Sequence, residues 1–187
     1  MSKIVEQLKT NSTTAPIVNL VNSSRYTILD QLQVEGYEID GHPFKSMLDK
    51  VIIDHQERVI KPFDLKCTWN VENFYEEYYL KRRSYIQALL YYAAIHKNRE
   101  VLGFDATEYH VEPPKFIVCD STNYFNPLLY TLDWPDLQDA RDGFTHKGRT
   151  YPGVKDLISA LRWCIQTDTW TISYKNYLSS GIINIKD

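Results

Sequence analysis

The sequence predicts an α/β fold in which a meander of three antiparallel strands is followed by helices and further strands. Apolar residues alternate on both sides of Asp40-Gly41, a dipeptide typical of a two-residue hairpin turn, and a third apolar run follows the polar turn 55–58. Asn70 then precedes a long stretch with the apolar spacing of a helix. These patterns predict a central mixed sheet flanked by helices.

The chain is expected to form one domain, 1–187. Its 187 residues are enough to bury a sizeable core, and no repeat, low-complexity segment or linker divides them. Within the domain we expect a helical segment at 1–24, a core at 25–100, and further strands and helices at 101–187.

The composition is that of an ordinary globular protein, with 43% hydrophobic and 24% charged residues. A net charge of −3 excludes the broad basic surface of a passive DNA-coating protein. No apolar run could span a bilayer and the polar start lacks a signal-peptide core, so we expect a cytoplasmic protein without membrane contact. Three cysteines without metal-type spacing predict unpaired thiols rather than a zinc site.

The first elements follow from residue spacing. Ile4 and Leu8 share one side of a short helix at 3–9, and the three strands occupy roughly 30–69. Pro62 lies inside the third strand and cannot donate a backbone hydrogen bond, so this strand should be bulged there or unpaired on one side.

The second half of the chain is predicted to alternate helices and strands. The stretch 71–98 fits one long helix or two in tandem. Strands are expected at 115–120 and 128–132, and helices at 135–140 and 154–166.

Charged residues lie within the otherwise apolar second and third predicted strands. Asp64 and Lys66 are two apart and point to one face, and pairing of the strands would bring Asp49 close to Asp64. An acid in such apolar surroundings is costly unless it is paired or binds a metal ion. Two carboxylates can hold Mg²⁺ or Mn²⁺, and a lysine beside them can stabilise charge during phosphodiester hydrolysis. The alternative is a solvated strand face with a cross-strand ion pair.

These residues resemble a known signature. Asp49 followed by Asp64-Leu65-Lys66 resembles the D-(x)n-(D/E)-x-K motif of the PD-(D/E)XK nuclease superfamily. Gln87-Ala-Leu-Leu-Tyr91 resembles the Q-x-x-x-Y motif of its RecB-like branch, and residues 30–100 are similar to phage-type recombination exonucleases.

The resemblance implies a restriction-endonuclease-like core and a Mg²⁺- or Mn²⁺-dependent deoxyribonuclease. It implies Asp49 and Asp64 as metal ligands, the Leu65 carbonyl as a third ligand, and Lys66 as the catalytic lysine. Many members carry an upstream acid or histidine that completes the metal site, and Glu6 stands in that order here.

Gln87 and Tyr91 share a helix face because they are four residues apart. The resemblance implies that they lie beside the active site and help to hold DNA or the metal-bound water, whereas Tyr91 could instead be an aromatic at the core edge. Arg83 and Ser84 would extend this stripe by one turn.

Two further features concern nucleic acid. Lys81-Arg82-Arg83 is the densest basic run, and it is either a solvated helix face or a phosphate contact. Arg82 and Arg83, together with Gln87, are therefore the candidate DNA contacts. Trp69, just past the lysine strand, is predicted to be a core residue rather than a base-stacking platform.

The function implied by the resemblance is an exonuclease acting on linear duplex DNA in recombination or phage DNA processing. Its partners would be the DNA substrate and a recombination or single-strand-annealing protein. Three alternatives stay open: an endonuclease of the same fold, a catalytically silent module that binds nucleic acid or protein, and a protein-interaction domain in which the motif is coincidental. The sequence predicts no oligomeric state.

Overall fold

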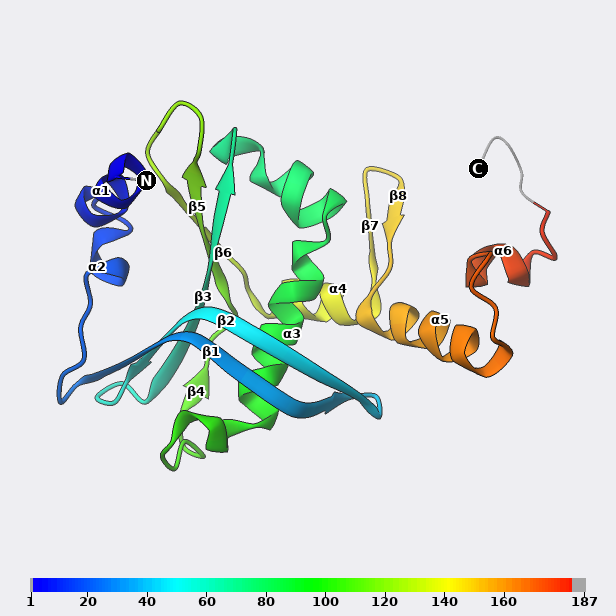
Figure 1. The fold of residues 1–187 in the computed structure, drawn as a ribbon, viewed down its shortest axis with the longest axis horizontal. Coiled ribbons are helices and arrows are strands. Elements are labelled where there is room, and N and C mark those ends of the chain that lie inside the picture. Colours follow the sequence, from blue (N-terminus) through cyan, green and yellow to red (C-terminus); the bar gives the residue numbers. More distant parts are fainter. Residues whose placement is uncertain (1, 183–187) are drawn as a thin grey trace.

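The structure, a computed structural model that describes residues 2–182, has a mixed α/β fold built around a central sheet (Figure 1). In the described residues this sheet has six strands in the order β1-β2-β3-β5-β6, with β4 beside β3. The strands are β1 (Tyr26–Ile39), β2 (His42–Asp54), β3 (Val59–Thr68), β4 (His110–Val111), β5 (Lys115–Asp120) and β6 (Leu128–Thr131). β1, β2 and β3 are antiparallel, β4 and β5 pair parallel with β3, and β6 is antiparallel to β5. The predicted mixed sheet begun by an antiparallel meander is confirmed.

The turn between β1 and β2 has the predicted form. Asp40 and Gly41 both have positive φ, +48° and +72°, as a two-residue hairpin turn with matching strand twist requires. The resulting ribbon is long and continues past α3 in Figure 1.

Pro62 is unpaired on one side of β3, as predicted. It faces Val51 in β2, but on the opposite side the ladder with β4 ends at Ile60 and the ladder with β5 begins at Phe63. Because a proline has no N–H to donate, it fits in this gap without loss of a sheet hydrogen bond.

The stretch after β3 forms two helical pieces in tandem rather than one helix. A 3₁₀ turn, η1 (Val71–Asn73), leads into a π-helix, η2 (Tyr75–Lys81), and α3 (Ser84–Lys97) follows. Asn70 caps the first piece, since its Oδ1 accepts the Glu72 N–H at 3.0 Å.

Arg83 breaks the helical stretch. Its φ of +58° is left-handed, and α3 begins only at the next residue, Ser84. The predicted extension of the Gln87 stripe to Arg83 is therefore wrong, because a left-handed residue cannot continue the α-helical spacing.

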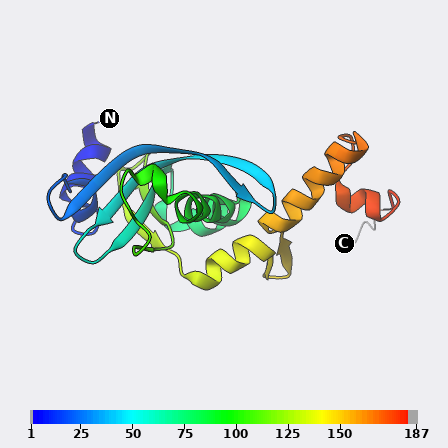
Figure 2. The same ribbon diagram turned by 90° about the horizontal axis from the view of Figure 1, so that it is seen from below.

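Helices cover both faces of the sheet. On one face α3 packs against the β1–β2 ribbon, and α4 (Trp134–Asp142) packs on the outer side of α3 (Figure 2). On the other face α1 (Ser2–Thr10) and α2 (Ala15–Val18) cover a smaller cluster in which Leu8 meets Ile52, Phe63 and Ile117. The larger core lies between the sheet and α3.

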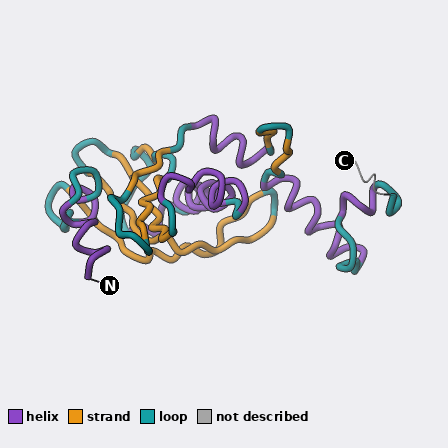
Figure 3. Tube along the Cα trace, turned by 90° about the horizontal axis from the view of Figure 1, so that it is seen from above, coloured by secondary structure: helices purple, strands orange, loops and turns teal. Residues whose placement is uncertain are grey.

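The C-terminal part begins against this body, where Tyr151 and Val154 belong to the larger core, and then extends away from it, as Figures 1 and 3 show. It consists of a small hairpin, β7 (Phe144–His146) and β8 (Arg149–Tyr151), then α5 (Val154–Thr167) and α6 (Tyr174–Leu178). Arg162 of α5 reaches the β1–β2 turn, where its Nε lies 2.7 Å from His42 Nε2. The strands β5 and β6 and the helices α4 and α5 were predicted, whereas β4, β7 and β8 were not.

No helix in the described residues is both long and apolar enough to cross a bilayer.

Candidate active site

Asp49 lies where β2 parts from β3. The ladder between these strands runs to Lys50 and Phe63, and the next pair in this register would be Asp49 and Asp64. Here the Leu65 N–H of β3 donates to a side chain of β2 rather than to a backbone carbonyl: Asp49 Oδ2 accepts it at 2.9 Å. The side chain therefore takes over a sheet hydrogen bond at the point where the strands diverge.

Gln31 of β1 holds the other oxygen of this carboxylate. Its Nε2 lies 3.2 Å from Asp49 Oδ1, and its φ of +53° places it in the left-handed region in the middle of a strand. Such a conformation costs about 1–3 kcal/mol and is concentrated at functional sites. Sequence reasoning missed Gln31, because a glutamine in an alternating strand carries no signal of its backbone angles.

Asp64, Lys66, Gln87 and Tyr91 form one connected network between β3 and α3. Lys66 Nζ lies 2.6 Å from Asp64 Oδ2 and donates to Gln87 Oε1 at 2.8 Å. Gln87 Nε2 in turn lies 3.1 Å from Asp64 Oδ1 and 2.7 Å from the Tyr91 hydroxyl. An ammonium on one side and a carboxylate on the other fix the orientation of the Gln87 amide.

Burial dominates the electrostatics of Asp64, which is 1% exposed. Removal from water raises the pKa of this carboxyl, and the nearby charge of Asp49 acts in the same direction. The Lys66 ammonium and, more weakly, the Tyr91 hydroxyl oppose the shift without cancelling it. Burial also raises the pKa of Tyr91, so its phenol stays neutral at physiological pH.

A cavity of about 380 Å³ opens beside the two carboxylates. Its walls include Asp49, Asp64 and Leu65, and on the opposite side Leu8 and Val18 from the N-terminal helices. Glu6, the acid expected upstream, is exposed on α1 and does not line this cavity.

The donor set is compatible with a hard divalent cation. Asp64 Oδ2 is buried and accepts no well-aligned hydrogen bond, although Lys66 Nζ is close. Mg²⁺ is commonly held by one or two carboxylates and keeps several waters, and two carboxylates are what Asp49 and Asp64 offer. Residues 2–182 contain no group of three or more His, Cys, Asp or Glu side chains placed to share a metal ion.

The basic run divides into paired and unpaired residues. Lys81 forms an ion pair with Glu77, whereas Arg82 and Arg83 are exposed and make no ion pair within residues 2–182. Arg82 stacks on the Tyr78 ring at 4.4 Å, and the Tyr78 hydroxyl lies 3.3 Å from the Cys67 carbonyl. Arg82 is therefore held close to the end of β3 that carries Lys66.

Trp69 is not a core residue, and the prediction that it is buried is wrong. It is 60% exposed, because the outer face of β3 is open from Leu65 onward and Leu65 and Cys67 are exposed as well. Cys67, Cys119 and Cys164 are all free thiols, as predicted.

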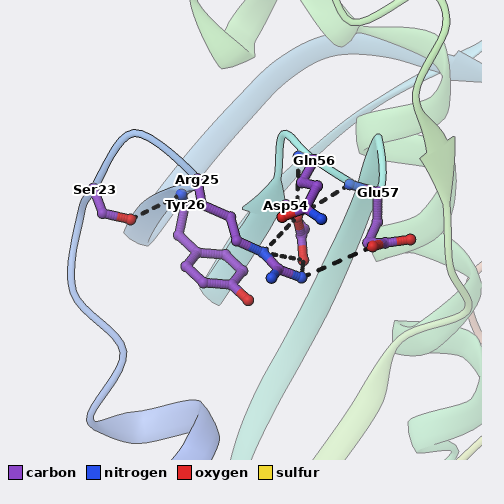
Figure 4. Close-up of polar contacts among 6 residues, drawn as sticks. All are labelled: Ser23, Arg25, Tyr26, Asp54, Gln56 and Glu57. Carbon is purple, nitrogen blue, oxygen red and sulfur yellow. Dashed lines mark hydrogen bonds and ion pairs between the residues drawn. The ribbon is translucent and has the colours of Figure 1, made fainter.

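A second buried aspartate, Asp54, lies at the other end of β2 (Figure 4). Arg25 binds it through two nitrogens, with Nη2 2.9 Å from Oδ2, and the turn N–H groups of Gln56 and Glu57 donate to Oδ1 at 3.1 Å. The hydrogen bond from Arg25 lowers the pKa of this carboxyl. Both oxygens of Asp54 are satisfied, which marks it as a structural residue.

No protein-family model and no curated protein sequence matches this chain.

Proposed function

We propose that this chain is a Mg²⁺-dependent deoxyribonuclease with a restriction-endonuclease-like core of the PD-(D/E)XK type. The observation that carries the proposal is the contact network: Asp49 and Asp64 line one cavity, Lys66 and Gln87 contact Asp64 at 2.6 and 3.1 Å, and Tyr91 contacts Gln87 at 2.7 Å. Residues that occur far apart in the sequence, in a recognisable order, meet in one place. The most concrete form is an exonuclease on linear duplex DNA in recombination or phage DNA processing.

Each residue has a distinct task in this proposal. Asp49 and Asp64 would hold the cation, which supplies an activated water and neutralises charge on the scissile phosphate. Lys66 would donate a hydrogen bond from Nζ to the phosphate or to the attacking water. Gln87 holds Lys66 and Asp64 at a fixed separation, and Tyr91 holds Gln87.

In this proposal, two arginines near the end of β3 would contact the DNA. Arg82 and Arg83 lack an ion-pair partner in the described part of the chain, so contact with a phosphate would cost them no existing interaction. Arg82 is already oriented by its stacking on Tyr78.

A catalytically silent nucleic-acid-binding module is the second candidate. It is favoured by the small donor set: of the three carboxylates at the cavity walls in the described residues, Asp30 is already ion-paired with Lys50, and Glu6 lies elsewhere. In this case the fold and the arginines would serve binding alone.

The deciding experiment is the cleavage of end-labelled linear duplex DNA and of a closed circle with Mg²⁺, Mn²⁺ or EDTA. We expect metal-dependent loss of the linear DNA only, and a loss of at least about 100-fold for Lys66→Ala. Lys45→Ala is the matched control, because Lys45 is an exposed lysine on the neighbouring strand β2 and lies outside the network. Cleavage of the circle would indicate an endonuclease. Well-folded protein that cleaves neither DNA would leave the silent module.

A further inference from the structure

A second cavity of about 480 Å³ lies at the end of β3 beyond the candidate active site. Trp69 and Phe125 stand at its walls and are 60% and 63% exposed, so two large aromatic faces are available to a ligand. Its volume falls within the range of small-molecule sites. Neither the contact network nor the proposed chemistry uses this cavity.

The wall on the β3 side is held rigidly. Asn70 caps η1 through the Glu72 N–H, and the Tyr130 hydroxyl donates to the Val71 carbonyl at 2.6 Å. These contacts fix the backbone of η1 directly after Trp69, which lowers the cost of ordering this wall when a ligand binds.

The wall on the other side is the loop 121–127, which is also tied down. Asp120 Oδ1 accepts the N–H groups of Thr122 and Asn123 at 2.7 and 2.8 Å, and Ser121 N–H donates to the Thr68 carbonyl at 2.8 Å. Gln7 of α1 donates to the Tyr124 carbonyl. The loop therefore carries Phe125 at a defined place opposite Trp69.

The polar groups of the cavity are amides and one carboxylate. Asn123 and Asn126 make no side-chain hydrogen bond within residues 2–182, and Glu72 is the charged residue at the walls. A carboxylate without a neighbouring cation repels phosphate, whereas flat aromatic faces with amide edges suit a heterocycle that has both a π face and hydrogen-bonding groups.

We propose that the cavity of Trp69 and Phe125 binds a nucleobase of a single-stranded DNA segment. The base stacks on the aromatic rings, and its edge meets Asn123, Asn126 and Glu72, while its phosphate stays outside. The reason for a DNA ligand rests on the proposed nuclease function, but the stacking itself rests on the cavity.

The position of the cavity fits a strand that also reaches the carboxylates. Leu65 lines the first cavity and Trp69 the second, and four residues of extended chain separate them by about 13 Å. This is the rise of about four stacked nucleotides at 3.4 Å each. Leu65, Cys67 and Trp69 are all exposed, so this face of β3 is open to solvent between the two cavities.

The test is the binding of a short labelled single-stranded DNA, measured by fluorescence anisotropy in EDTA so that no turnover is needed. The comparison ligand has the same length and charge but abasic sugars at every position. We expect wild type to bind the base-containing strand more tightly, and Trp69→Ala to weaken this binding by between about 5-fold and 150-fold. Trp69→Phe should retain most of the affinity. Trp170→Ala is the matched control, since Trp170 is 62% exposed and follows α5.

Two results would overturn the proposal: equal binding of the two strands by wild type, or unchanged binding by a folded Trp69→Ala protein. If the protein cleaves DNA and either result is found, the base site alone is wrong. If stacking is found in a protein that cleaves nothing, the base site stands and the nuclease function is wrong.

Discussion

Asp54 and Asp64 are equally buried, with exposed fractions of 2% and 1%, yet burial has opposite outcomes at the two residues. Asp54 receives hydrogen bonds on both oxygens from Arg25 and from a turn, and its pKa is lowered. Asp64 has one oxygen without an aligned hydrogen bond, and its pKa is raised. At Asp54 the hydrogen bond from Arg25 outweighs the effect of burial on the pKa, whereas at Asp64 burial outweighs the Lys66 ammonium, and this balance separates a structural acid from an acid left with free lone pairs.

The largest effect is expected when the charge of Asp64 is removed. Asp64→Asn should reduce DNA cleavage by at least about 100-fold, because a neutral amide is a poor ligand and no longer balances Lys66. Its melting temperature should change less than that of an Asp54 variant. Steady-state cleavage and a thermal melt of the same preparation give both readings, and full activity in the variant would remove Asp64 from the site.

Asp54→Ala should have the opposite pattern: the variant should cleave DNA at low temperature but have a lower free energy of unfolding. Arg25 is 42% exposed, so water screens the ion pair, and the turn N–H groups left unsatisfied account for much of the loss. We expect a cost of about 2 kcal/mol, and a fall in Tm of about 4–8 °C for a chain of this size. Asp30→Ala is the control, because Asp30 also forms an ion pair, with Lys50, but its carboxylate is 65% exposed. A Tm equal to that of the control would contradict a structural role for Asp54.

The pH dependence of stability provides a third test. Because the pKa of Asp54 is lowered in the folded state, the unfolded chain takes up a proton first as the pH falls. The stabilisation is present above the unfolded pKa of about 3.9 and is lost as the pH falls towards the folded pKa. Urea denaturation should therefore show that the advantage of wild type over Asp54→Asn shrinks below about pH 4. A difference that stays constant through the acidic range would argue against this linkage.

The smallest effect is expected at the edge of the network. Tyr91→Phe removes the hydroxyl bonded to Gln87 but keeps the ring in the core, so cleavage should fall by about 10-fold or less. Gln87→Ala should cost more, because Gln87 contacts both Lys66 and Asp64. A larger loss from Tyr91→Phe than from Gln87→Ala would contradict a role for Tyr91 that acts only through Gln87.

The parts of the fold that repeat regularly were predictable. A period of two placed Asp64 and Lys66 on one face of β3, and a separation of four placed Gln87 and Tyr91 on one face of α3. The Asp40-Gly41 turn fixed the pairing of β1 with β2. These local rules place the residues on their faces, whereas the approach of Gln87 to Lys66 and Asp64 was implied only by the family resemblance.

The features that could not be predicted depend on single backbone angles and on which segments cover which faces of the sheet. Gln31 reaches Asp49 through a left-handed φ, and Arg83 interrupts the helix in the same way, neither of which residue type or spacing reveals. Trp69 reads as a core aromatic until the structure shows an uncovered face of β3. Strands of two or three residues, such as β4, β7 and β8, are too short to have a period.

The hydrogen bond from Leu65 N–H to Asp49 Oδ2 turns a backbone amide into a sensor of the carboxylate. A cation that draws electron density from Oδ2 weakens this bond, so the NMR chemical shift and the hydrogen-exchange rate of the Leu65 amide should both respond. Occupancy of the site can thus be followed at one resonance in the absence of DNA. Asp49→Asn preserves an acceptor for this amide, whereas Asp49→Ala leaves it to water and loosens β3 where it parts from β2.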